Sequence, residues 1–236
     1  MFSCELLEAV GRWQKGWRED QDLREELAIA LKEQASALPL KFRSVNSMCY
    51  RKRFLHRGEL IDLILRDGRT EGVTSWTTDK PYAEMFKGHL RPDAISAAIF
   101  AHKPCEGDVI LNIPALWSDA EFVAVANEFA TCEKDWAKAL HNFRDLQQEI
   151  ILEVPLRGSD IIGLSGVASP FDELCDREGI HQDQRDALFK SLIDSGTYPG
   201  EPIYTSPEGA QRAIQRTIEG ILEVIRTGRS WTPPNK

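Results

Sequence analysis

The sequence lacks the short motifs that identify many enzyme families. It contains no GxSxG nucleophile elbow, no GxxxxGK[ST] phosphate loop and no HExxH zinc motif. A GxGxxG turn is absent as well, so a dinucleotide, if one binds, is not held by a Rossmann turn. The chemistry must therefore be sought in scattered polar residues.

Cysteine and histidine are scarce and widely spaced. The five cysteines form no CxxC pair, and no histidine lies near them at metal-ligand spacing; they are Cys4, Cys49, Cys105, Cys132 and Cys175. We therefore expect reduced, buried thiols and no metal site. The five histidines form no sequence-close pair, which favours surface or core roles for them; they are His56, His89, His102, His141 and His181.

Long apolar runs are also missing. No run approaches the roughly 18 apolar residues that a membrane-spanning helix needs. The first residues, MFSCELLEAV, place Glu5 and Glu8 where a signal peptide would need a basic end and an uncharged core. We expect a cytoplasmic protein with no membrane partner, although a toxin exported without a signal would look the same.

Acidic residues outnumber basic ones. The chain has 236 residues, of which 37 are acidic and 29 basic, giving a net charge of -8. This balance opposes loose binding to nucleic acid through bulk charge. However, residues 41–57 carry six cations and no acidic residue, so either a local basic groove or an ordinary solvated positive face remains open.

Apolar spacing divides the chain into helical ends and a middle rich in strands. With 42% hydrophobic residues, the chain can bury one substantial core. Residues 1–40 show helical periodicity with a break near Glu19-Asp20, which predicts two helices. We expect an α+β protein with N-terminal helices at 1–40, a core at 41–165 and C-terminal helices at 166–236, which could belong to the same domain.

The middle segment predicts short strands separated by helices. Strands are expected at 47–53, 72–78, 94–102, 108–116, 149–156 and 160–166. Helices are expected at 58–68, 79–86, 118–130, 133–143, 169–179, 182–196 and 206–228. Asp79 or Thr78 would cap one helix, Ser206-Pro207 is a good N-cap and N1 pair for the last, and residues 229–236 look like a loose tail.

Three polar signals lie on these strands. Arg51 follows Tyr50 on the first, Ser75 and Thr77 end the second, and Gln147 and Glu149 open a later one. Each has an ordinary explanation, because an arginine can cover a sheet edge, a Ser/Thr cluster can cap a helix and a glutamate at a strand start can be solvated.

In that order, the three signals resemble the signature of the ADP-ribosyltransferase superfamily, in the group with arginine, then Ser-Thr-Ser or a variant, then Gln/Glu-x-Glu. The matching stretches are Tyr50-Arg51, Ser75-Trp76-Thr77 and Gln147-Gln148-Glu149, with Ala83 and Phe86 on the helix after the second. The resemblance covers about residues 47–165. Trp76 and Thr77 depart from the usual small residue and second serine.

This resemblance implies a split NAD-binding β-sandwich core with NAD as co-substrate. Tyr50, Arg51, Thr77 and Phe86 would form the NAD site. The guanidinium of Arg51 would bind pyrophosphate oxygens, and Thr77 would support its strand. Phe86 would either stack on the nicotinamide ring or close the apolar end of its helix.

The resemblance assigns catalysis to Glu149, Ser75 and Gln147. The carboxylate of Glu149 would stabilise positive charge on the ribose as the glycosidic bond breaks, and Ser75 would orient it. Gln147 stands where arginine-modifying relatives usually have a second glutamate. An amide cannot take a proton from a nucleophile, so we expect an acceptor other than arginine, either another protein residue or a nucleobase.

The expected function is therefore mono-ADP-ribosyl transfer from NAD to a macromolecule, protein or nucleic acid, inside a bacterial cell. A toxin of a toxin–antitoxin or phage-defence pair, with an antitoxin or inhibitor protein as partner, is one setting for such an enzyme. Two alternatives stay open: an NAD glycohydrolase, or a silent binding or regulatory module in which Arg51 and Glu149 form an ion pair. The flanking helices could pack on the core, bind an inhibitor or recognise the acceptor.

Overall fold

The computed structural model describes residues 2–18, 20–56, 58–66, 68–87, 91, 94, 96–130, 134–165, 175–195 and 204–228. The chain forms two compact units, each built from three separate segments. Unit 1 comprises residues 1–51, 70–83 and 102–155, and unit 2 comprises residues 52–69, 84–101 and 156–236. The predicted division at residues 40 and 165 stays a prediction.

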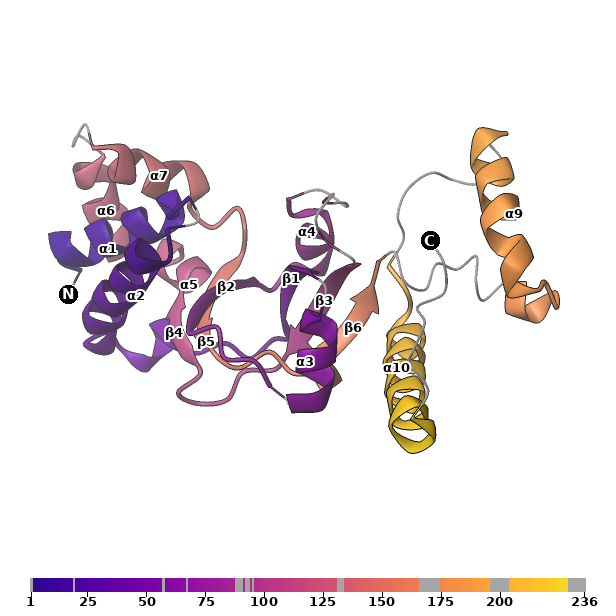
Figure 1. The fold of residues 1–236 in the computed structure, drawn as a ribbon. Helices are drawn as coiled ribbons and strands as arrows, with labels where there is room; N and C mark the ends of the chain where they lie inside the picture. Colours follow the sequence, from indigo (N-terminus) through magenta and orange to yellow (C-terminus); the bar gives the residue numbers. More distant parts are fainter. Residues whose placement is uncertain are drawn as a thin grey trace. The chain divides into compact units, whose positions relative to one another are not determined.

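Helices lie at both ends of the described chain, and the strands lie between them, interrupted by further helices (Figure 1). The helices are α1 (Cys4–Lys15), α2 (Gln21–Ser36), α3 (Glu59–Arg66), α4 (Lys80–Met85), α5 (Ile113–Trp117), α6 (Ala120–Phe129), α7 (Asp135–Phe143), α9 (Gln182–Asp194) and α10 (Pro207–Thr227). The strands are β1 (Cys49–Leu55), β2 (Val73–Thr77), β3 (Ser96–His102), β4 (Val109–Asn112), β5 (Glu149–Glu153) and β6 (Ile161–Leu164).

The strands form an open sheet in the order β4-β5-β2-β1-β3-β6. The pairs β1–β2, β2–β5, β3–β6 and β4–β5 are antiparallel. Strands mixed with separate helices make the protein α+β, as the sequence predicted.

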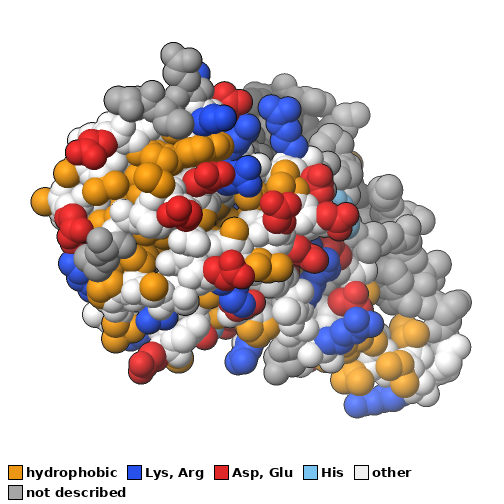
Figure 2. Space-filling model, turned by 90° about the vertical axis from the view of Figure 1, so that its left-hand side faces the viewer, with side chains coloured by type: hydrophobic (Ala, Val, Ile, Leu, Met, Phe, Trp, Pro, Cys, Tyr) orange, Lys and Arg blue, Asp and Glu red, His pale blue; other side chains and the backbone are white. Residues whose placement is uncertain are grey.

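Unit 1 has a core between its helices and the strands β2, β4 and β5. Buried side chains of α1 and α2 pack there with others from α5, α6, α7, β4 and β5; those with 0% exposure are Leu7, Val10, Leu31, Leu111, Ile113, Leu116, Phe122, Ala126, Leu140 and Ile151. Ser3 and Asp20 cap the two N-terminal helices, whose separation near residue 20 confirms the prediction. Figure 2 shows the side of the molecule that lies on the left in Figure 1, where apolar side chains also reach the surface among charged ones.

Helices α1 and α7 touch at a glycine. A Cβ added to Gly11 would lie 2.3 Å from the carbonyl oxygen of Trp136, so no larger residue fits there without moving the backbone. Leu6, Leu7 and Val10 of the same helix are at most 2% exposed. Helix α1 is therefore a fixed part of the core of unit 1.

Unit 2 contains β6, α3, α9, α10 and all of β3 except His102. Ser206 accepts a hydrogen bond from the backbone N–H of Gly209, and Pro207 occupies the first turn, which confirms the predicted start of α10. Gln211 of α10 donates to the carbonyl of Ile161, and the backbone N–H of Thr205 donates to that of Leu164. These bonds attach the start of α10 to strand β6.

Two sequence predictions are wrong. Residues 108–116 form a strand only to Asn112, whose side chain accepts from the N–H of Ala115 and starts the short helix α5. Cys4 and Cys105 are exposed, because one opens α1 and the other lies in the turn before β4, whereas Cys49 and Cys175 are buried as expected. Cys132, most of the predicted helix at 169–179 and the tail at 229–236 lie outside the described residues.

No helix in the described part of the chain is long and apolar enough to cross a bilayer.

Candidate functional site

Five signature residues belong to unit 1 and lie on the neighbouring strands β1, β2 and β5; they are Tyr50, Arg51, Ser75, Thr77 and Glu149. Thr77 of β2 stands opposite Tyr50 of β1 on one side and opposite Glu149 of β5 on the other. Because side chains alternate along a strand, Ser75 shares a face with Thr77 and lies diagonally from Glu149. The Ser75 hydroxyl donates to Oε1 of Glu149 at 2.5 Å. The sheet thus joins two of the predicted catalytic residues directly.

The carboxylate of Glu149 is buried and held by three donors. Its residue is 4% exposed. Besides Ser75, the indole N–H of Trp13 donates to Oε1 at 3.2 Å and the side-chain amide of Gln14 donates to Oε2 at 3.3 Å. Burial raises the pKa of Glu149 above its ordinary value, while these hydrogen bonds oppose the rise. Desolvation prevails, so the group gains its charge at a higher pH than a solvated glutamate.

The contribution of α1 to this site was missed at the sequence level. Helical periodicity in residues 1–40 places Trp13 on an apolar helix face, and its indole ring is buried there, at 2% exposure. A buried indole N–H needs an acceptor, and that requirement was the one available signal. Periodicity alone cannot say that the acceptor is a carboxylate 136 residues further along the chain.

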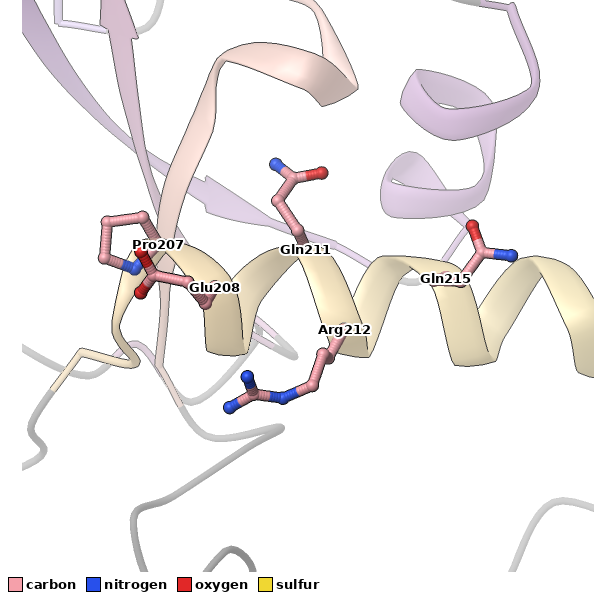
Figure 3. A pocket seen from close by; sticks show the side chains of 5 residues that line it. All are labelled: Pro207, Glu208, Gln211, Arg212 and Gln215. Atoms are coloured by element: carbon pink, nitrogen blue, oxygen red, sulfur yellow. The ribbon is translucent and has the colours of Figure 1, made fainter.

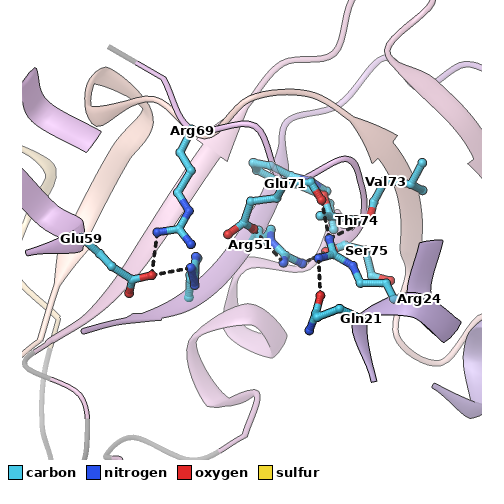
Figure 4. Close-up of polar contacts among 11 residues, drawn as sticks. Gln21, Arg24, Arg51, Glu59, Arg69, Glu71, Val73, Thr74 and Ser75 are labelled. Atoms are coloured by element: carbon cyan, nitrogen blue, oxygen red, sulfur yellow. Dashed lines mark hydrogen bonds and ion pairs between the residues drawn. The ribbon is translucent and has the colours of Figure 1, made fainter. Parts of the chain in front are cut away.

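Arg51 lies on β1, next to β2, and its guanidinium contacts other groups of the protein. Its guanidinium donates to the backbone carbonyl of Ser75 at 2.8 Å and pairs with the carboxylate of Glu71 at 3.2 Å (Figure 4). The side chains of Arg51 and Glu71 are 22% and 10% exposed. A planar fork in this setting suits an anion, and Glu71 supplies one from the protein itself.

Arg24 of α2 reinforces this edge of β2. Its guanidinium donates to the backbone carbonyls of Glu71 and Val73, and Figure 4 shows it reaching toward that stretch of chain. Arg24 donates to the β2 carbonyl of Val73 and Arg51 donates to that of Ser75. Both carbonyls come before Thr77, the residue of β2 that pairs with Tyr50 of β1. Neither Arg24 nor Glu71 was a candidate from the sequence, because their positions depend on tertiary packing.

Thr77 connects β2 to the turn before β5. Its hydroxyl donates to the backbone carbonyl of Gln147 at 2.7 Å and accepts from the N–H of Asp79. The N–H of Thr78 donates to the carbonyl of Gln148, and Asp79 caps α4 by accepting from Tyr82, one of the two predicted caps. The main chain of Gln147 is therefore fixed next to Glu149.

The turn at 144–148 is well bonded internally. The N–H groups of Leu146 and Gln148 donate to the carbonyls of Phe143 and Asp145, and the Gln148 side chain donates to Asp145 as well. Leu146, directly before Gln147, is 72% exposed. An ordered turn thus presents an apolar side chain beside the candidate site.

Trp76 does not crowd the Ser75 face. It lies between Ser75 and Thr77 on β2, so it faces the opposite side of the sheet. There it is 3% exposed and donates its indole N–H to the hydroxyl of Thr74 at 2.9 Å. The large central residue of Ser75-Trp76-Thr77 is thus accommodated without reaching the carboxylate.

Phe86 and Tyr50 keep their predicted NAD roles only as predictions. Phe86 follows α4, belongs to unit 2 and is 39% exposed, with the ammonium of Lys87 lying 5.4 Å from the ring centre. Tyr50 belongs to unit 1 and is partly buried on β1.

A separate hollow of about 570 Å³ lies along α10 in unit 2. Its walls come from Pro207, Glu208, Gln211, Arg212 and Gln215 (Figure 3). Among the described residues the lining comes from this one helix, whereas a small-ligand site is usually enclosed from several sides. It contains no residue of the candidate site. Within the ranges that the structure covers, no cluster of histidine, cysteine and acidic side chains could hold a metal ion.

Comparison with family models, curated proteins and solved structures gives no match to this chain.

Proposed function

We propose that the protein is a mono-ADP-ribosyltransferase that moves ADP-ribose from NAD to a macromolecular acceptor. One observation carries the proposal. The Ser75 hydroxyl donates a hydrogen bond to the buried carboxylate of Glu149, and the Ser75 backbone carbonyl accepts one from the guanidinium of Arg51. One residue therefore connects the two charges that such a reaction needs. The order of these residues along the chain is also that of the family signature.

The site residues are chemically suited to NAD. Arg51 would exchange its partner Glu71 for pyrophosphate oxygens, because a guanidinium fork binds either anion. Glu149 would hydrogen-bond a ribose hydroxyl and stabilise positive charge on the ribose. Bound NAD would supply an activated glycosidic bond, whose cleavage releases neutral nicotinamide with the bonding electrons. An acceptor atom then bonds to the ribose and loses its proton to solvent or a neighbouring base, since Gln147 cannot take it.

The ordered turn favours transfer over hydrolysis. A glycohydrolase needs only water as acceptor, whereas a transferase needs a surface that positions a second macromolecule. The internally bonded turn at 144–148, with Leu146 exposed, provides such a surface next to Gln147. NAD hydrolysis is the second candidate and is an outcome of the test below.

The contacts of Arg51 and Glu149 also bear on the silent-module alternative. That hypothesis requires an ion pair between them, but Arg51 pairs with Glu71 and the three donors to Glu149 are neutral side chains. A buried carboxylate held by neutral donors is costly for stability. Such a cost is typical of functional sites, where the shifted pKa of a side chain serves catalysis or binding.

The acceptor that the structure favours is a protein. Cations from the basic segment 41–57 are engaged by the protein: Lys41 pairs with Asp119, Arg51 with Glu71 and Arg53 with Glu59, while Lys52 donates to the carbonyl of Glu84. Each pairing reduces the charge available to phosphates. The net charge of -8 acts in the same direction.

The decisive experiment is incubation of the full chain with labelled NAD and a bacterial lysate separated into protein, RNA and DNA. We expect label in protein with the wild type. Glu149→Gln should reduce transfer by about 10²- to 10³-fold, as loss of one electrostatic stabiliser does in other enzymes. The variant should still fold, because the amide fits the space of the carboxylate.

Glu153→Gln is the matched control. Glu153 lies on the same strand β5, and its side chain is 41% exposed in an ion pair with Lys32. Such a pair contributes about 0–1 kcal/mol, so this variant should keep full activity. Nicotinamide release without transfer would replace the transferase by the glycohydrolase. Full activity of Glu149→Gln, or no consumption of NAD by folded wild type, would refute the assignment.

A further inference from the structure

Helix α1 places two donors on the one carboxylate that the proposed reaction uses. Trp13 and Gln14 are consecutive residues, and each bonds a different oxygen of Glu149. The helix is fixed by its buried apolar face and by the close contact of Gly11 with the backbone of Trp136. These donors therefore sit on a rigid element.

The chemistry of both donors fixes their role. An indole N–H donates and cannot accept, and that of Trp13 is shared between the hydroxyl oxygen of Ser75 at 3.1 Å and Oε1 of Glu149 at 3.2 Å, so both oxygens are acceptors for Trp13. The amide nitrogen of Gln14 donates to Oε2 of Glu149 and also to the backbone carbonyl of Arg144, each at 3.3 Å. Rotating this amide by half a turn would place its oxygen against that carbonyl. Gln14 is therefore held as a donor, and both carboxylate oxygens are held as acceptors.

We propose that Trp13 and Gln14 are positioning residues, which hold the Glu149 carboxylate ionised and in one orientation for the reaction. This inference rests on the proposed function, in which Glu149 acts as a carboxylate. It assigns the N-terminal helix to the catalytic site. A displaceable cover is the competing role for α1, and it would require the buried apolar face of the helix to leave the core.

The test uses variants that remove a donor and keep the shape. Trp13→Phe retains an aromatic ring but loses the N–H, and Gln14→Met retains the length but loses the amide. A hydrogen bond to a charged group contributes enough for each variant to lower kcat by about 10- to 100-fold. The KM for NAD should change by less than about 2-fold, because neither residue is assigned to NAD binding.

The pH profile separates positioning from a structural role. Fewer donors make the charged form of Glu149 less stable, so the acidic limb of kcat should move to higher pH in both variants. The donors from α1 and β2 are neutral, and the titrating group that faces Glu149 from α4 is Tyr82. Burial and the charge of Glu149 raise the Tyr82 pKa above its ordinary value of 10.0.

A readout without NAD makes the inference independent of activity. The ionisation of Glu149 can be followed by carbon NMR on selectively labelled protein, and its pKa should rise in Trp13→Phe and in Gln14→Met. Trp17→Phe is the matched control, because Trp17 lies just beyond the C-cap of α1 with its ring 5.2 Å from that of Trp13. That control should leave both the pKa and kcat unchanged.

The outcomes distinguish this inference from the proposed function. Unchanged kcat and unchanged pKa in both variants would overturn the inference, as would faster turnover, which would make α1 a cover. If wild type consumes no NAD but the pKa of Glu149 rises in both variants, the proposed reaction is wrong. The inference that Trp13 and Gln14 stabilise the ionised carboxylate would then still be supported. Should one variant fail to fold, the other decides.

Discussion

At the scale of single residues, Glu149 is the group with the least ordinary surroundings. A solvated glutamate interacts with water, whereas this one is enclosed by an indole, an amide and a hydroxyl. Three neutral donors do not replace full hydration, and burial is the dominant cause of the raised pKa. The residue therefore imposes a pH-dependent cost on folding.

The sign of that dependence gives a prediction. The folded pKa lies above the ordinary value of 4.5, so between those two values the folded state binds more protons than the unfolded state. Stability of the wild type should thus fall as the pH rises from 4.5 through the folded pKa. Glu149→Gln does not titrate there, so its melting temperature should exceed that of the wild type by a margin that grows over the same window.

Thermal melts of both proteins across this pH range measure the margin. Glu153→Gln serves again as the control, because Glu153 is exposed on the same strand and should give a margin that stays nearly constant. A margin for Glu149→Gln that shrinks with rising pH would mean that the hydrogen bonds outweigh burial.

The candidate residues that sequence could supply are those fixed by strand order. Ser75, Thr77 and Glu149 follow a linear signature, and adjacent antiparallel strands bring them together. Trp13, Gln14, Arg24 and Glu71 could not be found in this way. Their contacts span from 20 to 136 residues of sequence and depend on how α1, α2 and the segment before β2 pack on the sheet.

At the scale of elements, the contact between α1 and α7 determines whether Glu149 keeps its donors. Gly11→Ala would place a methyl group 2.3 Å from the carbonyl oxygen of Trp136, so the helices must separate. We expect a loss of about 1–3 kcal/mol in unfolding free energy, typical of overpacked cores. Denaturant unfolding measures it, and the proposed transferase activity should fall as Trp13 and Gln14 shift.

Gly220→Ala in α10 is the matched control. The same methyl group added there meets nothing within 4 Å, and alanine favours a helix interior over glycine by about 0.5–1 kcal/mol. This substitution should therefore stabilise the protein and leave activity unchanged. Equal effects of the two glycine variants would refute the tight contact in the core.

The start of a helix could be predicted from the sequence where a capping side chain marks it. Ser206 caps α10 as predicted, and Asp20 caps α2 at the break predicted near that residue. The short helix α5 was missed because Ile113–Trp117 continues an apolar run that suits a strand, and only the capping bond of Asn112 starts the helix. For a short buried apolar segment, the residue pattern alone cannot distinguish a helix from a strand.

At the scale of the whole molecule, charge and an exposed apolar residue determine the acceptor we expect. The chain has a net charge of -8, and Lys41, Arg51 and Arg53 of its basic segment pair with acidic side chains. Leu146 projects from the ordered turn before Gln147 and is 72% exposed. An apolar side chain beside a reactive centre suits contact with a protein surface.

Leu146→Ser should therefore lower the labelling of protein acceptors by about 10-fold, which corresponds to the loss of one well-packed interface residue at roughly 1.4 kcal/mol. Release of nicotinamide into water should stay unchanged, because the substitution leaves Glu149, Ser75 and Arg51 in place. Exposed Leu222 of α10, substituted in the same way, is the control and should have no effect. Nuclease treatment of the lysate should leave the label in place, whereas loss of label to nuclease would make a nucleobase the acceptor.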